Sequence, residues 1–193
     1  MTHTVLNGKD LILLLLYVPG YRGEKCEGIV GRTRIMKMIF LFRKEVWASF
    51  KFDKVIPEEY LPNFIPYDYG PFSTTVYSDI EFLKNLTFVT SGDEMLETTE
   101  EEALEYQWWL EEVDLGEQEL SAYQAERFAL TPKGRSFVED ILLGRLSMEQ
   151  IRVLSAFKVR CTSVSLHTLL KYVYTKYKDY TSNSKIKEEI FRR

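Results

Sequence analysis

A chain of 193 residues is long for one minimal domain and short for two full ones, so one core with an extension is expected. Hydrophobic residues make up 45% of the sequence and aromatic residues 14%, which is enough apolar surface to offset the entropy of ordering and argues against a globally disordered protein. The net charge of -4 is uneven, because twelve acidic residues and no Lys or Arg lie between Asp93 and Glu119, whereas Arg145 to Arg193 hold eleven basic and four acidic residues.

The first expected helix runs from about Gly8 to Val18. Asn7 is suited to cap its N-terminus, Asp10 lies near the positive end of the helix dipole, and Pro19-Gly20 ends the helix. The apolar run from Leu11 to Val18 is 8 residues long, far below the roughly 20 that a membrane-spanning helix needs. An acidic residue directly before this run also does not fit a secretory signal. We therefore expect a buried helix, no membrane partner and a cytoplasmic location.

A loop is expected from Gly20 to Gly31, followed by a second helix that begins at Arg32. Apolar residues recur in it at helical spacing: Ile35, Met38, Ile39, Phe42 and Val46. Arg34 and Lys37 fall largely off that stripe, which predicts an amphipathic helix with one basic side. Arg32, Arg34 and Lys37 are therefore the candidate residues for contact with nucleic-acid phosphates.

Residues 48–66 are expected to form an irregular connection that can include one extended piece, and Tyr67 to Ser73 a turn. A third helix follows, capped by Ser73 or Thr74, with Val76, Ile80 and Leu83 as its buried stripe. Its outward positions are mostly neutral or acidic, namely Thr74, Thr75, Ser78, Asp79, Glu81 and Asn85. Because major-groove recognition favours Arg, Lys, Asn and Gln, this composition is poor for a helix that recognises DNA bases.

Two short strands are expected next, Leu86 to Thr90 and Arg127 to Leu130, and Thr131-Pro132 then begins another helix. The order helix, helix, helix, strand, wing, strand is that of a winged helix. We therefore predict a mainly α protein with a small β-hairpin: a winged helix-turn-helix core over residues 1–144, carrying an acidic wing insert at about 91–124. The insert is expected to be a solvated, partly disordered wing.

Residues 145–193 are predicted to form a C-terminal helical extension that packs on the core. Ser147 and Gln150 form a capping box before one helix, and Ser165 precedes a second apolar stripe. A final helix is expected over roughly Ser182 to Arg193. This extension carries much of the basic charge, which suits phosphate contact, whereas the acidic insert would repel it.

Several segments together resemble one family. The stretches Gly31–Leu41, Tyr67–Ser73, Phe128–Gly134 and Leu169–Ser184 look like those of the YwgA-like proteins, which are related to the Panacea (SocA-like antitoxin) domain. Tyr-Gly-Pro-Phe-Ser is the most specific of these motifs. The resemblance implies a mostly helical winged-helix fold and a role in regulation or toxin neutralisation, with no catalytic residues to transfer. The insert from Asp93 to Glu119 is a departure from the compact relatives.

No catalytic, metal or cofactor site is predicted, and the protein is not expected to be an enzyme. His3 and His167 are the only histidines, and a helix-surface or packed role is expected for His167. Cys26 and Cys161 are too few and too far apart for a disulfide framework or a zinc site, and both are expected to be reduced. None of the common nucleotide-binding or hydrolase motifs occurs.

Two aromatic groups are candidate partner contacts. Trp108 and Trp109 lie within the acidic insert, where they either return to the core, which we favour, or anchor a partner. Tyr67 and Tyr69, with Phe72, either wedge the turn between helices, which we favour, or line a pocket. The main hypothesis is a non-enzymatic, antitoxin-like winged-helix regulator that binds a protein partner; a homodimer is compatible with it. The alternative is a DNA-binding transcriptional regulator.

Overall fold

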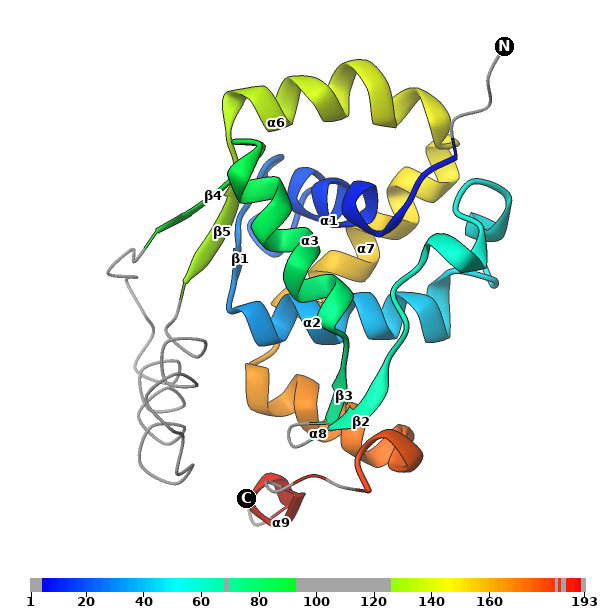
Figure 1. Ribbon diagram of the computed structural model, residues 1–193, viewed down its shortest axis with the longest axis vertical. Coiled ribbons are helices and arrows are strands. Elements are labelled where there is room, and N and C mark those ends of the chain that lie inside the picture. The colour runs from blue at the N-terminus through cyan, green and yellow to red at the C-terminus, as the bar shows by residue number, and fades with distance from the viewer. Residues whose placement is uncertain (1–4, 68–69, 93–125, 183, 185–186, 192–193) are drawn as a thin grey trace.

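The computed structural model describes residues 5–67, 70–92, 126–182, 184 and 187–191, and within them the chain is mainly helical, with small antiparallel sheets (Figure 1). This confirms the predicted class at that level. The helices are α1 (Gly8–Tyr17), α2 (Arg32–Leu41), α3 (Thr74–Asn85), α6 (Pro132–Phe137), α7 (Met148–Thr162), α8 (Leu166–Lys176) and α9 (Lys187–Phe191). Single π-helical turns continue α2 and α6, over Phe42–Val46 and Val138–Leu142.

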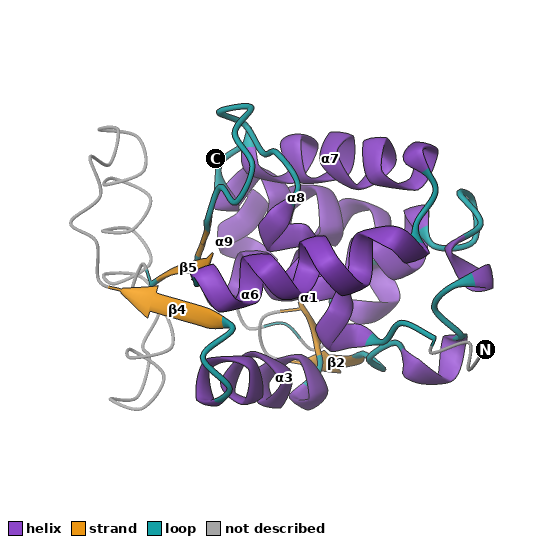
Figure 2. Ribbon diagram, turned by 90° about the horizontal axis from the view of Figure 1, so that it is seen from above, coloured by secondary structure: helices purple, strands orange, loops and turns teal. Residues whose placement is uncertain are grey.

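The larger sheet has the strand order β1-β5-β4 and lies at one end of the helical body (Figure 2). Its strands are β1 (Ile29–Val30), β4 (Val89–Gly92) and β5 (Arg127–Leu130), and both outer strands run antiparallel to β5. β5 has the predicted bounds, whereas β4 begins later than expected because Thr87, with φ 57, first closes the end of α3. The prediction of a loop from Gly20 to Gly31 is wrong for Ile29 and Val30, because these two residues form β1 and pair with β5.

The smaller sheet is a hairpin of β2 (Ile65–Tyr67) and β3 (Gly70–Phe72), where an irregular connection open to one extended piece and then a turn were predicted. Gly70 has φ 81, and an added Cβ there would lie 2.9 Å from the ring of Tyr174. Glycine is thus required at this position both by the backbone and by the close approach of α8. The hairpin is therefore held against the C-terminal helices.

The helix α1 lies in the middle of the molecule, and each of its residues from Leu11 to Tyr17 is at most 3% exposed (Figure 1). Asn7 caps the helix as predicted, and with Asp10 it forms a capping box that was not predicted: the Asn7 side chain accepts from the backbone of Asp10, whose carboxylate accepts from the backbone of Asn7. Its length is that of a buried globular helix, and no helix within the described ranges is long and apolar enough to cross a membrane.

The apolar stripes of α2 and α3 converge on one core around α1, as their spacing predicts. The core residues from the two helices include Ile35, Met38, Ile39, Val76, Ile80 and Leu83. The same cluster contains residues of α7 and α8, among them Leu154, Phe157, Leu170 and Val173. The helices after residue 145 therefore share the hydrophobic core of the preceding part of the chain.

An ion pair joins α1 to α3. Lys9 Nζ lies 2.9 Å from a carboxylate oxygen of Asp79, whose side chain is 7% exposed. The prediction that Asp79 faces outward is therefore wrong, because this carboxylate points toward α1 and forms an ion pair with Lys9. Lys9 also lies over the ring of Phe82, 5.3 Å from its centroid, so its stem covers one edge of α3.

Glu45, in the π-helical turn after α2, ties the C-terminal helices to the core. Its carboxylate accepts hydrogen bonds from Tyr172 (2.7 Å), Tyr177 (2.8 Å), Lys176 (3.0 Å) and Arg160 (2.8 Å). Burial alone would raise the pKa of Glu45, but these donors hold it below its ordinary value. One carboxylate thus connects α2 with both α7 and α8.

The start of α6 packs directly on the backbone of Phe88, the residue before β4. Thr131 caps α6 by accepting from the backbone of Gly134, as the sequence predicts. An added Cβ at Gly134 would lie 2.1 Å from the carbonyl oxygen of Phe88, whereas at Gly144 it would meet open space. We predict that Gly134→Ala lowers the free energy of unfolding by about 1–3 kcal/mol, because backbone must shift to admit the methyl group.

The matched control is Gly144→Ala, which is expected to leave stability unchanged or to raise it by up to about 1 kcal/mol. Both variants are measured by urea denaturation. Equal stabilities for the two variants would contradict the close approach of α6 to the backbone of Phe88.

Lys158 of α7 is fully buried and donates to three backbone carbonyls near the end of α1, those of Leu16 (3.4 Å), Val18 (2.8 Å) and Glu27 (2.6 Å). Burial lowers the pKa of Lys158 to about 8. A lysine in an unfolded chain titrates near 10.4, so between these values the unfolded chain holds a proton that the folded chain has released.

The unfolding free energy is therefore expected to rise between pH 8 and 10, with a contribution from Lys158 of at most about 1.4 kcal/mol per pH unit. The Lys158→Met variant should show a shallower rise in denaturation experiments at pH 7, 8, 9 and 10. Parallel pH profiles for the two proteins would refute the burial of this ammonium group.

Candidate functional site

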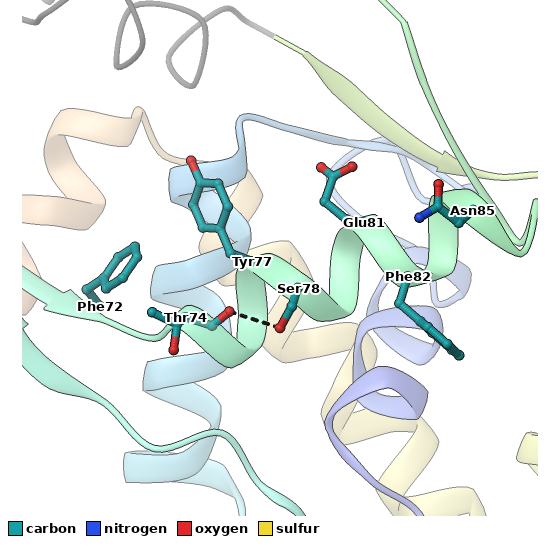
Figure 3. A pocket seen from close by; sticks show the side chains of 7 residues that line it. All are labelled: Phe72, Thr74, Tyr77, Ser78, Glu81, Phe82 and Asn85. Carbon is teal, nitrogen blue, oxygen red and sulfur yellow. Dashed lines mark hydrogen bonds between the residues drawn. The ribbon is translucent and has the colours of Figure 1, made fainter.

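The outward face of α3, together with Phe72, lines an open pocket of about 570 Å³ (Figure 3). Its lining consists of Phe72, which precedes the helix, and two rows of α3 side chains, namely Thr74, Ser78 and Phe82, and Tyr77, Glu81 and Asn85. Residues four apart in a helix lie one above the other, so each row forms a ridge and the pocket lies along both. These two rows face outward because the apolar stripe on the other side of α3, Val76, Ile80 and Leu83, is buried in the core.

Aromatic side chains continue this face onto the β2-β3 hairpin. The rings of Tyr67 and Phe72 lie 5.0 Å apart, and those of Phe72 and Tyr77 lie 5.9 Å apart. Tyr67 is 45% exposed, Phe82 46% and, just after the helix, Leu86 39%. We call these side chains and the pocket lining the α3 face. Several large apolar side chains exposed along one helix and its neighbouring hairpin make a candidate contact surface.

The charges beside the α3 face are paired within the chain. Arg32 lies 2.7 Å from Glu81 and 3.3 Å from Glu126, and Lys84 lies 3.0 Å from Glu126. The Arg32 guanidinium also lies over the ring of Tyr77, 4.7 Å from its centroid. Burial would lower the pKa of Arg32, but the hydrogen bond to Glu81 raises it above its ordinary value. This arginine is therefore a fixed cation with partners already in place.

Two other residues predicted to contact nucleic acid point into the molecule. Arg34 donates to the backbone carbonyls of Cys161 (2.7 Å) and Val164 (2.8 Å), where α7 ends. Lys37 is 2% exposed and donates to the carbonyl of Pro71 at 2.9 Å. Burial lowers the pKa of Lys37 to about 7. The prediction of a basic side on α2 is wrong for Lys37, because its stem follows the apolar stripe into the core.

The structure does not bring together all the predicted contact residues. Tyr67 lies on the α3 face, and Arg32 lies beside it. Tyr69, Trp108 and Trp109 lie outside the described residues, as does nearly all of the predicted acidic insert. Contact of Arg32, Arg34 and Lys37 with nucleic acid stays a prediction, and the structure gives each of them a contact inside the chain.

The other candidate chemistry lies apart from this face. Cys26 is partly buried and Cys161 buried, both are free cysteines, and burial raises the pKa of Cys161 to about 11. His167 lies within α8. Within the described part of the chain, no group of three or more His, Cys, Asp or Glu residues is arranged to hold a metal ion.

Sequence reasoning missed Phe82 as a surface residue. It lies on the same helix as the buried stripe but off its spacing, and the structure leaves it 46% exposed. An aromatic residue on the polar side of an amphipathic helix is the signal that could have identified it. Glu45 was missed as well, because its partners come from helices that begin more than a hundred residues later.

The contacts of Arg34 predict a structural role that can be measured. Arg34→Ala removes two charged hydrogen bonds to helix-end carbonyls and is expected to lower the free energy of unfolding by about 1.5–3 kcal/mol. Arg152→Ala changes an exposed arginine of α7 and should stay within about 0.5 kcal/mol of the wild type. Thermal and urea denaturation compare the two, and equal losses would show that the helix-end contacts do not stabilise the fold.

Comparisons with models of protein families, with curated proteins and with solved structures found no match. The likeness to the YwgA-like proteins therefore stays a prediction that depends on the motifs of the sequence itself.

Proposed function

We propose that this chain is a winged-helix regulatory protein of the antitoxin-like kind, without catalytic activity, that acts in the cytoplasm by binding a protein partner through the α3 face. The single observation that carries the proposal is the composition of that face. It presents aromatic rings and hydroxyl groups to solvent, and its carboxylate, Glu81, is already paired with Arg32. Apolar and aromatic surface of this kind contributes most to protein–protein binding.

The order of elements supports the winged-helix part of the proposal. Along the chain it runs α1, β1, α2, the β2-β3 hairpin, α3, β4 and β5; apart from that hairpin, this is the order of a winged helix, and the strand that precedes α2 pairs with the last strand of the sheet. The antiparallel pairing of β4 with β5 fits the two paired strands of a wing. In such a fold α3 is the helix that would enter a DNA groove.

The same helix makes the DNA-binding alternative the weaker one. DNA recognition depends on Arg and Lys that reach phosphates and base edges. The lining of the α3 pocket contains neither, and Arg32 and Lys84 beside it are paired with Glu81 and Glu126. A carboxylate in the middle of the helix would moreover lie against phosphates. The likeness to antitoxin-like proteins favours a protein partner as well.

The proposal is tested by affinity capture from lysate of the source cells at physiological salt, followed by mass spectrometry. Phe82→Lys puts a charge on the α3 face and is expected to reduce recovery of a specific protein at least about tenfold, the loss expected for a central aromatic contact. Ile141→Lys is the matched control, because Ile141 is 45% exposed and precedes α7 on another surface.

The control should recover the same protein as the wild type. Recovery of nucleic acid alone by the wild type, or equal recovery of the protein by both variants, would overturn the proposal.

A further inference from the structure

The surface around Glu45 carries an excess of positive charge. Lys44 of the π-helical turn after α2, Arg160 of α7 and Lys176 of α8 gather there, and both ion pairs that they form in the described part of the chain go to Glu45. α7 lies on the opposite side of the molecule from α3 (Figure 2), and the α3 pocket shares no residue with this surface. We call the three cations, with the tyrosine rings beside them, the basic face, and we propose that it binds an acidic segment of a protein partner.

A series of ring contacts joins Lys44 to the rest of the basic face. The Lys44 ammonium lies 4.7 Å from the ring centroid of Tyr180, in the turn after α8. The rings of Tyr180 and Tyr177 each lie 5.0 Å from the ring of Phe40. On the other side, Lys176 Nζ lies 5.7 Å from the ring centroid of Tyr177. Cations from two distant segments of the sequence are thus held over one aromatic cluster.

The three cations keep hydrogen-bond donors for a ligand. The Arg160 guanidinium has five N–H groups, donates to Glu45 through Nη2, and is 56% exposed as a side chain. Lys176 has three N–H groups, donates to Glu45 and Tyr172, and is 49% exposed. Lys44 is exposed and is paired with no carboxylate among the residues that the structure describes. One carboxylate therefore does not neutralise this surface.

Glu45 does not have to lose its own partners when a ligand binds. The hydroxyl groups of Tyr172 and Tyr177 donate to it at 2.7 and 2.8 Å, and these bonds remain when carboxylates of a ligand approach Arg160 and Lys176. A segment with several Asp or Glu residues can place one carboxylate on each cation. Charge-assisted hydrogen bonds of this type are stronger than those between neutral groups and select the sign of the partner.

Two observations favour a protein segment over a nucleic acid. Single-stranded nucleic acids bind by stacking their bases on aromatic rings, but Lys44 already lies over Tyr180, and Lys176 over Tyr172 at 5.2 Å. A base would have to displace a cation to stack on that side of the ring. Three cations are also few compared with the roughly 6–10 phosphate contacts of proteins that bind DNA through its backbone.

The first experiment selects binders of the full chain from a random library of short displayed peptides. Peptides rich in Asp and Glu are expected for the wild type, and Lys44→Glu should abolish this enrichment because it reverses one of the three charges. Lys25→Glu is the matched control, since it changes the net charge equally. Lys25 is exposed and also lies over a tyrosine ring, 5.6 Å from the centroid of Tyr17.

The second experiment measures the dissociation constant of one selected acidic peptide by fluorescence anisotropy. Lys44→Glu should raise it at least about threefold, because a repulsion replaces an exposed ion pair. Lys44→Gln removes the charge without reversing it and should raise the constant less, whereas Lys25→Glu should leave it unchanged. Added salt should weaken the wild-type complex, since exposed charges are screened. Circular dichroism verifies that the variants are folded.

A wild-type selection without acidic peptides, equal effects of the two Lys44 variants, or an equal loss with Lys25→Glu would each overturn the acidic ligand. Tighter binding of a labelled single-stranded oligonucleotide, lost in Lys44→Glu, would overturn it in favour of nucleic acid.

The α3 face is tested separately, because Phe82→Lys should leave the affinity for the acidic peptide unchanged. If Phe82→Lys weakens that peptide as much as Lys44→Glu does, the basic face is not its binding site.

Discussion

The structure depends on the complete burial of α1. From Leu11 to Tyr17 this helix has no face toward solvent, so every side of it must be covered by another element. A helix that is apolar on all sides is stabilised by burial of every side. Unlike an amphipathic helix, it has no polar face that can stay in contact with water. α3, α7, the strand β5 and the π-helical turn after α6 all contact it. The arrangement of the fold is thus largely the arrangement of layers around one helix.

Three basic side chains of this protein point inward, with Lys37 and Lys158 buried and Arg34 partly buried. Arg34, Lys37 and Lys158 direct their charges at backbone carbonyls, two of them at the ends of helices, where the helix dipole is negative. These contacts satisfy carbonyl groups that would otherwise be left without a donor. The consequence for function is that part of the basic charge counted from the sequence does not contribute to a positive surface. The α3 face, by contrast, presents rings and hydroxyls.

The elements that could be predicted from the sequence are those determined by neighbouring residues. The caps formed by Asn7, Thr131 and Ser147 are local hydrogen bonds, and the structure has all three. β1 could not be predicted, because two residues carry no periodicity and Ile29 becomes a strand only by pairing with Phe128. The burial of Lys37 could not be predicted either, because the spacing of residues along a helix does not distinguish a lysine with a buried aliphatic chain from one in solvent. The candidate site was found only in part: Tyr67 was chosen, and Phe82 was overlooked.

The hydrogen bonds of Lys158 join two segments that are synthesised far apart in time. The last carbonyls of α1 receive their donor from a residue 140 positions further along the chain. During translation α1 therefore emerges well before α7, which supplies this donor and part of its cover. Until α7 has left the ribosome, the nascent chain exposes its most apolar segment, and long-range closure of this kind slows folding and favours aggregation. Between the emergence of α1 and that of α7, the nascent chain is most exposed to aggregation.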